Sequence, residues 1–269
     1  MRFDAYCASV KDQQFGYVAE AINSSMGGII THGKPMRRYA QTLNIDVGIR
    51  TAAWVGVDAA TGGIYIEGKG ETSPALAKAI RVHFPDHSCP RADVCEDYDS
   101  DGAFKSLQAV IRANMGRRVK GGYVALPDDV EDGKTWAAGV RGGIAYVRLY
   151  EAGKHPDRVH LNRPNWARSE GEFRPHYARD KVAAAKMKPI DFWGLTAWSH
   201  RVGEALSQVP INRFEPEIRK YSQDKTTRYI ALTFRRHLEE MRANGEDIDR
   251  TFQAVWQDQD EYIARHKKR

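Results

Sequence analysis

The chain has 269 residues, of which 42% are hydrophobic, and a formal net charge of +6. This content favours a folded protein with a large core over a disordered one, and no apolar run reaches the ~20 residues of a membrane span. The N-terminal residues are charged where a signal peptide would be apolar, and three cysteines do not make a disulfide framework. We therefore expect a cytoplasmic protein that does not contact a membrane.

The positive charge is concentrated in one part of the chain. Residues 101–188 hold 17 Lys and Arg against 10 Asp and Glu, whereas residues 1–100 hold 10 against 12. Such a basic segment is typical of proteins that bind a polyanion such as nucleic acid, and it is equally compatible with an ordinary solvated surface. Charge alone leaves both interpretations open.

The first part of the chain is predicted to alternate strands and helices. Period-two alternation and β-rich composition predict strands at residues 2–10, 45–58, 63–70 and 91–99. Apolar side chains at helical spacing predict helices at residues 13–22, 73–81 and 101–116. Ser73 and Pro74 are typical of a helix N-terminus and support the start of the second helix.

The second part of the chain begins with a predicted loop at residues 117–133 and then follows the same plan of paired strands followed by helices. "KTWAAGV" and "GIAYVRLY" flank "RGG" and predict a hairpin, and "NWARSEGEFR" predicts a further strand. Helices are predicted at residues 176–187 and 190–206. We therefore expect an α+β fold whose mainly antiparallel sheet has two similar halves, 1–116 and 117–205, with flanking helices. Residues 206–269 are predicted to form a C-terminal helical extension with a hairpin at 224–265.

The strand at residues 144–150 carries polar side chains on one face. Alternation places Tyr146, Arg148 and Tyr150 together, while the apolar residues between them point to the other face. At ~3.3 Å per residue the two tyrosines are about 13 Å apart, too far to act on one phosphate in the same step. One of them can therefore be a nucleophile while the other is structural or binds a base. Packing on a half-buried strand remains the common role of such tyrosines.

Two other predicted strands carry carboxylate side chains. Asp93 and Asp97 share one face of their strand, and Arg168, Glu170 and Glu172 share a face of another. Several buried carboxylates require a counter-ion, and hard oxygen ligands suit Mg²⁺ or Mn²⁺. The alternative is a set of ion pairs, Asp93 with Arg91 and Glu170 with Arg168, and spacing alone favours this alternative.

Three segments, "RADVCEDYD", "TWAAGVRGGIAYVRLYEAGK" and "WARSEGEFRP", together resemble the replication initiation factor family of rolling-circle plasmids and filamentous-type phages. In that family an Arg-x-Asp strand with a later Asp precedes a hairpin that ends in Arg-hydrophobic-Tyr-acid, then a lysine and an Arg-x-Glu strand. The likeness covers roughly residues 40–205, in the same order. Lys154 departs from the pattern, because it follows Tyr150 by four residues where many members have two.

The resemblance implies an enzyme that nicks and rejoins one DNA strand at an origin of rolling-circle replication, through a tyrosine joined to a 5′ phosphate. The catalytic residues implied are Tyr150, Arg148 and Lys154. The residues implied to hold Mg²⁺ or Mn²⁺ are Asp93, Asp97 and Glu170. The partners implied are single-stranded or unpaired origin DNA, a host helicase and polymerase, and a second copy of the chain.

The basic segment supplies candidate DNA contacts, which we assign to Arg168, Arg174, Arg179, Lys181 and Lys186. Two other functions remain open. A non-catalytic phage or plasmid regulator would keep the fold and bind DNA without forming a covalent adduct. A mobilisation relaxase would use similar chemistry in conjugation.

Overall fold

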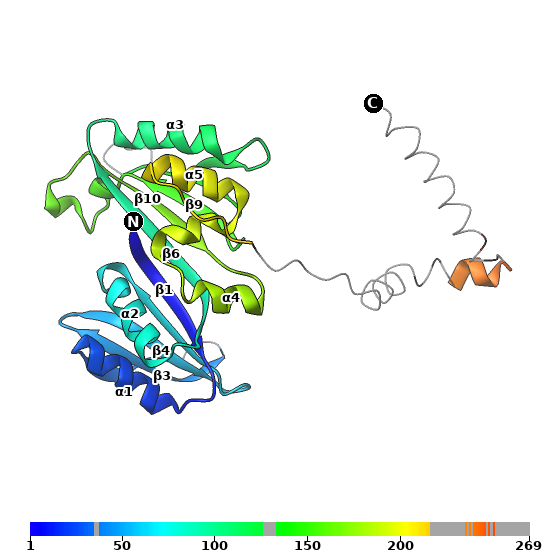
Figure 1. Ribbon diagram of the computed structural model, residues 1–269, viewed down its shortest axis with the longest axis horizontal. Helices are drawn as coiled ribbons and strands as arrows, with labels where there is room; N and C mark the ends of the chain where they lie inside the picture. Colours follow the sequence, from blue (N-terminus) through cyan, green and yellow to red (C-terminus); the bar gives the residue numbers. More distant parts are fainter. Residues whose placement is uncertain are drawn as a thin grey trace. The chain divides into compact units, whose positions relative to one another are not determined.

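The computed structural model describes residues 1–34, 38–125 and 133–215, together with a few residues between 235 and 250 (Figure 1). The chain divides into two units, Met1–Glu217 and Ile218–Arg269. In the second unit residues 239–243 are helical, and Gly245 with φ 73° follows them. Most of the predicted hairpin at 224–265 lies outside the described residues.

The first unit is built on one sheet in which all neighbouring strands are antiparallel. The strands of the described chain are β1 (Arg2–Val10), β2 (Ile29–His32), β3 (Tyr39–Val47), β4 (Arg50–Asp58), β5 (Ile64–Lys69), β6 (Ser88–Asp99), β7 (Gly121–Ala125), β8 (Thr135–Gly139), β9 (Ala145–Tyr150) and β10 (Trp166–Phe173). Their order across the sheet is β2-β3-β4-β5-β1-β6-β10-β9-β8-β7. The α-helices are α1 (Phe15–Met26), α2 (Ser73–His83), α3 (Ala103–Met115), α4 (Ala178–Ala184) and α5 (Ala197–Ser207).

The sheet consists of two halves with the same connectivity. In each half one strand (β1 or β6) is followed by a helix, four more strands and another helix. β1 and β6 pair with each other at the centre, and the remaining strands extend outward in matching order. The predicted α+β fold with two similar halves is confirmed. The halves divide before Ser88 rather than at residue 116, because β6 and α3 begin the second half.

The α-helices of the described first unit pack on one face of the sheet. Their apolar side chains form a single core with strand residues such as Ile66, Val94 and Leu149. Figure 1 shows α1 and α2 beside the β1–β5 half and α3, α4 and α5 beside the β6–β10 half. Because successive side chains of a strand point to opposite faces, the residues between these core positions lie on the face without helices, which we call the open face.

Three predicted elements differ from the structure for local reasons. The expected strand at 45–58 is two strands, because Gly48 with φ 63° forms a hairpin turn that pairs Val47 with Arg50. β7 lies within a segment expected to be a loop. The expected helix at 190–206 is a 3₁₀-helix and α5, separated by Thr196, whose extended backbone allows its side chain to accept a hydrogen bond from the Ser199 N–H at 3.1 Å.

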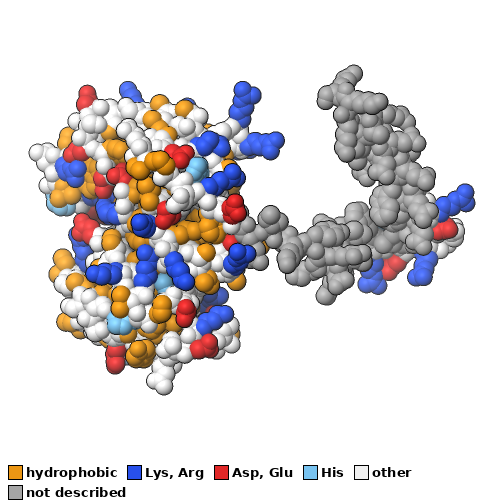
Figure 2. All heavy atoms as spheres, viewed as in Figure 1, with side chains coloured by type: hydrophobic (Ala, Val, Ile, Leu, Met, Phe, Trp, Pro, Cys, Tyr) orange, Lys and Arg blue, Asp and Glu red, His pale blue; other side chains and the backbone are white. Residues whose placement is uncertain are grey.

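Charged side chains on the visible surface are mixed. On the face of the first unit that Figure 2 shows, Lys and Arg side chains are spread over both halves, with Asp and Glu side chains among them. None of the helices in the described part of the chain has the length and apolar character needed to cross a bilayer.

Candidate active site

The polar residues predicted from strand alternation meet on the open face of β6, β10 and β9. β10, which lies between β6 and β9, places Arg168 between Asp97 and Tyr150, and Glu170 opposite Arg148. Glu172, two residues further along, lies between Asp93 and Tyr146. Directly opposed residues in antiparallel strands lie within contact distance of each other. The register therefore brings the sequence-predicted tyrosines, arginines and carboxylates into three adjacent rows.

Tyr150 is held by a carboxylate from the neighbouring strand. Its hydroxyl donates a hydrogen bond to Oε2 of Glu170 at 3.1 Å, and the Arg148 guanidinium donates to Oε1 of the same carboxylate. Burial raises the pKa of Tyr150 above its ordinary value, and the nearby Glu170 charge raises it further. Burial also raises the pKa of Glu170, although the Arg148 charge acts to lower it. Tyr150 is therefore a neutral hydroxyl with a proton acceptor already in position.

Arg168 is a buried cation held by two carboxylates. Its side chain donates to Asp97 at 2.6 and 3.0 Å and to Asp4 at 2.9 Å, and only 4% of the residue is exposed. Trp166 adds an N–H donor to Asp97 at 2.7 Å. Burial acts to raise the pKa of Asp97, but the hydrogen bonds from Arg168 outweigh it and lower that pKa. This network orders the row that contains Tyr150.

Asp97→Ala is expected to destabilise the fold by about 3 kcal/mol, because it removes one partner of the buried Arg168 charge while Asp4 still binds it. Urea unfolding measures the change. Asp99→Ala on the same strand is the control: it breaks an exposed pair with Arg163 at 2.7 Å and should cost at most about 1 kcal/mol. Equal losses in the two variants would contradict the assignment of Arg168 as a buried, network-held cation.

The contribution of Asp97 should also depend on pH in a defined direction. Its pKa is lowered in the folded protein, so its stabilisation is fully present above the unfolded pKa of about 3.9 and is lost as the pH falls through the folded value.

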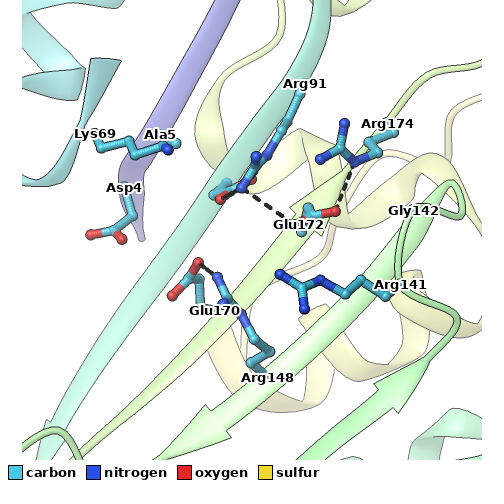
Figure 3. Close-up of a pocket in the computed structure, with 11 residues that line it drawn as sticks. Asp4, Ala5, Lys69, Arg91, Arg141, Gly142, Arg148, Glu170, Glu172 and Arg174 are labelled. Carbon is cyan, nitrogen blue, oxygen red and sulfur yellow. Dashed lines mark hydrogen bonds and ion pairs between the residues drawn. The ribbon is translucent and has the colours of Figure 1, made fainter. Parts of the chain in front are cut away.

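A cavity of about 580 Å³ opens beside this network on the same face. Figure 3 shows charged side chains around it, with Arg141 pointing in from the β8–β9 turn. Arg91 binds Asp93 at 2.5 Å and Glu172 at 3.3 Å, and Arg174 binds Glu172 at 2.7 Å. The cavity is lined by Asp4, Ala5, Lys69, Arg91, Asp93, Arg141, Gly142, Arg148, Glu170, Glu172 and Arg174.

Two cationic groups at this cavity have donor capacity to spare. Arg141 is exposed and has no ion-pair partner among the described residues. The buried Nε of Arg148 has no hydrogen-bond partner in the described part of the chain. The exposed guanidinium of Arg141, which points into the cavity, is suited to an anion such as a phosphate.

The predicted metal-binding residues are not gathered at one point. Asp93 and Glu170 line the cavity, whereas Asp97 lies in the next row and binds Arg168. Each of the three carboxylates is paired with a guanidinium. Among the described residues, no three Asp, Glu, His or Cys side chains form a group that could hold a metal ion. As arranged in this structure, these carboxylates do not fit a divalent cation, and the expected use of Mg²⁺ or Mn²⁺ stays a prediction from the sequence.

The remaining predicted site residues lie in different places. Lys154 ends the short 3₁₀-helix Ala152–Lys154 after β9, and its ammonium binds Glu151 at 3.1 Å. Arg174 lines the cavity. Arg168, also a predicted DNA contact, is buried and paired with Asp97 and Asp4. The other three predicted DNA contacts lie on or just after α4, which packs on the helix-covered face: Arg179, Lys181 and Lys186. Their assignment to DNA stays a prediction.

Several residues of the site were not found from the sequence. Asp4 reaches Arg168 from β1, and Arg141 reaches the cavity from the hairpin turn that precedes β9. Arg158 lies 5.9 Å from the centre of the Tyr150 ring. Strand alternation placed Glu172 on the same face as Glu170, but nothing in the sequence assigned it a role. Asp4 had none, because nothing in the local sequence shows that β1 pairs with β6.

The first unit is thus an α+β protein with a duplicated antiparallel sheet, whose open face carries a tyrosine, carboxylate and arginine network. A solved structure with a similar fold is that of a rolling circle replication initiator protein from Geobacillus stearothermophilus. The match has a TM-score of 0.52 and 14% sequence identity, and covers 79% of this chain and 98% of that one. No family model and no curated protein matches the sequence. The likeness at this identity is one of fold.

Proposed function

We propose that the protein initiates rolling-circle replication by nicking and rejoining one DNA strand through Tyr150. The observation that carries the proposal is the hydrogen bond from the Tyr150 hydroxyl to Glu170, in the row beside Arg148 and Arg168. The motifs in β6, β9 and β10 resemble those of replication initiation factors, and the similar fold of a rolling circle replication initiator protein supports the same role.

The proposed reaction is a transfer of one phosphodiester bond to the tyrosine. Tyr150 Oη attacks the phosphorus, and its proton passes to Oε2 of Glu170, 3.1 Å away. The bond from phosphorus to the 3′ oxygen breaks, and that oxygen takes a proton from solvent. The products are a tyrosine joined to the 5′ phosphate and a free 3′ hydroxyl. Attack by a 3′ hydroxyl on the phosphotyrosine reverses the steps and rejoins the strand.

The arginines of the site are placed for the charge of this phosphate. In the strand register Arg148 lies opposite Glu170 and Arg168 lies opposite Tyr150, and Arg141 and Arg148 line the adjoining cavity. Arg168 is already bound by Asp97 and Asp4, so Arg141 and Arg148 are the groups placed for the phosphate. Preorganised guanidinium groups stabilise the charge that develops on a phosphoryl group in the transition state. Lys154 remains a proposal for the same role. The use of Mg²⁺ or Mn²⁺ stays a prediction from the sequence, which a chelator added to the cleavage reaction checks.

Formation of a covalent adduct tests the function. The protein is incubated with single-stranded DNA from the region of its own gene, denatured and digested with nuclease, and mass spectrometry seeks a nucleotide on Tyr150. An adduct through a 5′ phosphate is expected. DNA binding without an adduct under any ionic condition would instead support the non-catalytic regulator.

Salt dependence of binding distinguishes the two possible DNA faces. Replacing Arg141 and Arg174 with Gln should lower the slope of log K against log salt by about 1.4, since each phosphate contact on single-stranded DNA contributes about 0.7. Fluorescence anisotropy with oligo-dT measures this slope. The triple variant of Arg179, Lys181 and Lys186 is the comparison. A larger change in the triple variant would place the DNA path on the helix-covered face.

A further inference from the structure

The open face continues from the active site into the first half of the sheet, where it changes character. Tyr39, Trp54 and Tyr65 lie there on the neighbouring strands β3, β4 and β5. The rings of Tyr39 and Tyr65 stack with centroids 5.8 Å apart, and the Trp54 ring meets Tyr39 edge-on at 5.2 Å. All three side chains are half-buried. We call these three residues the aromatic platform.

The aromatic platform is not part of the core described above. Core residues of the same strands, such as Val55 and Ile66, point toward α1 and α2, and Trp54 and Tyr65 alternate with them. A Cβ atom on Gly56 would lie 2.4 Å from the Trp54 ring, so the ring rests directly over the bare backbone of β4. Aromatic rings grouped on a sheet face away from the core are typical of a binding surface.

The duplicated topology places the aromatic platform in a position equivalent to the active site. Glu67 of β5 lies between Cys7 and Trp54, just as Glu170 of β10 lies between Cys95 and Arg148. Trp54 therefore occupies in the first half the place that Arg148 occupies in the second. At this position the second half of the open face carries the guanidinium of Arg148, and the first half carries the aromatic ring of Trp54.

The cavity connects the two halves. Its lining runs from Arg148 on β9 across the sheet to Lys69 at the end of β5. β9 and β5 are four strand steps apart, which is about 19 Å at ~4.8 Å per step. Lys69 is paired with Glu67 at 2.8 Å, so the surface of β5 at this end of the cavity carries little net charge. At the far side the Arg38 guanidinium lies 5.1 Å from the centre of the Tyr39 ring and is paired with Asp58 at 3.1 Å.

We propose that Tyr39, Trp54 and Tyr65 form a base-stacking subsite for the single-stranded DNA whose phosphate reacts at Tyr150; the proposal rests on the function proposed above. Unpaired bases offer flat faces to aromatic rings regardless of sequence, whereas bases in a duplex are already stacked on each other. The strand passes from Tyr150 over the cationic cavity to the aromatic platform. The cavity binds its phosphates and the platform binds its bases.

The test compares oligo-dT of increasing length, in a Tyr150→Phe background so that no covalent step contributes. Trp54→Ala should weaken binding of long oligomers about 5- to 150-fold, the range observed when one stacking residue is removed. Oligomers too short to reach from the cavity to β4 should bind as before. The salt slope should not change, because no cation is removed. Trp54→Phe should retain most of the affinity.

A matched control lies on the other face of the sheet. Tyr17 of α1 is 52% exposed and also packs edge-on against another ring, Phe84. Tyr17→Ala should leave binding of every oligomer unchanged. Unchanged binding of long oligomers by Trp54→Ala, or an equal loss in Tyr17→Ala, overturns the subsite.

Photocrosslinking of the unsubstituted protein gives a second test that does not depend on the folding of a variant. Oligonucleotides containing bromouracil should crosslink to peptides that contain Trp54 or Tyr65. Crosslinks confined to peptides of β9 and β10 overturn the proposal. If a 5′ adduct forms but Trp54→Ala binds normally, the subsite fails and the proposed function stands. If binding depends on Trp54 and no adduct forms, the subsite stands and the nicking function fails.

Discussion

Tyr150→Phe should abolish the covalent protein–DNA adduct while the folded protein still binds single-stranded DNA. The change removes only the hydroxyl, which donates to Glu170 at 3.1 Å and supplies the attacking oxygen. The measurement is a denaturing gel with origin oligonucleotides labelled at the 5′ or the 3′ end. A protein-linked band should appear only when the label lies downstream of the nick, because the tyrosine retains the 5′ phosphate.

Tyr146→Phe is the matched control, since both tyrosines lie on the open face of β9. Tyr146 lies opposite Gly139 and Glu172 and is 8% exposed, and its hydroxyl makes no hydrogen bond within the part of the chain that the structure describes. Adduct formation should persist. An adduct that survives Tyr150→Phe but not Tyr146→Phe would show that the wrong tyrosine was chosen. If both variants still form the adduct, the nucleophile lies outside β9.

Much of the candidate site could be predicted because strand alternation is a local property of the chain. The period of two fixed which of Tyr146, Val147 and Arg148 share a face, whatever strands lie beside them. The pairing of Asp93 with Arg91 was also accessible, because the two residues are two positions apart on one strand. Local geometry of this kind needs no knowledge of the sheet order.

The contacts between strands could not be predicted, because they depend on which strands are neighbours. The sequence suggested an ion pair between Glu170 and Arg168, but the structure pairs Glu170 with Arg148 and Arg168 with Asp97. These partners come from β9 and β6, on either side of β10. The contact of Asp4 with Arg168 could not be predicted for the same reason, because β1 pairs with β6 over a long separation in sequence.

The boundary of the two halves was misplaced for a similar reason. The first half begins with β1 and the second with β6, and these two strands pair at the centre of the sheet. The sequence of β6 does not indicate that it lies at the centre. β7 lies in the segment predicted as a loop, and its glycines, Gly121 and Gly122, are unfavourable in strands. A Cβ on Gly121 would lie 2.4 Å from the Trp136 ring, so the close approach of that ring explains the glycine.

Glu170→Gln should lower the single-turnover rate of adduct formation by about 10²- to 10⁴-fold, the usual contribution of a positioned general base. The reason lies in the environment of Tyr150. Burial and the Glu170 charge raise the pKa of its hydroxyl, so the phenol cannot ionise on its own near neutral pH and must lose its proton during attack. Glu170 is the carboxylate in hydrogen-bond contact with that hydroxyl. An amide in its place can hold the hydroxyl but cannot accept the proton.

Glu172→Gln is the control, because it lies two residues along the same face of β10 and is also bound by arginines, at 2.7 Å from Arg174 and 3.3 Å from Arg91. It leaves a similar unpaired guanidinium but does not contact Tyr150. Its rate should fall less than about tenfold, below the range of a lost general base. Equal losses in the two variants would indicate that charge balance in the cavity, rather than proton transfer, is what Glu170 provides.

The pH dependence separates these two roles of Glu170. Burial raises its pKa above the ordinary value of about 4.3, and only the ionised carboxylate can accept the proton of Tyr150. In the parent protein the rate should therefore rise with pH through this raised pKa and then level off. Glu170→Gln should lose this acidic limb, and Glu172→Gln should keep it. An unchanged limb in Glu170→Gln would assign the titrating base to another residue, whatever the size of the rate loss.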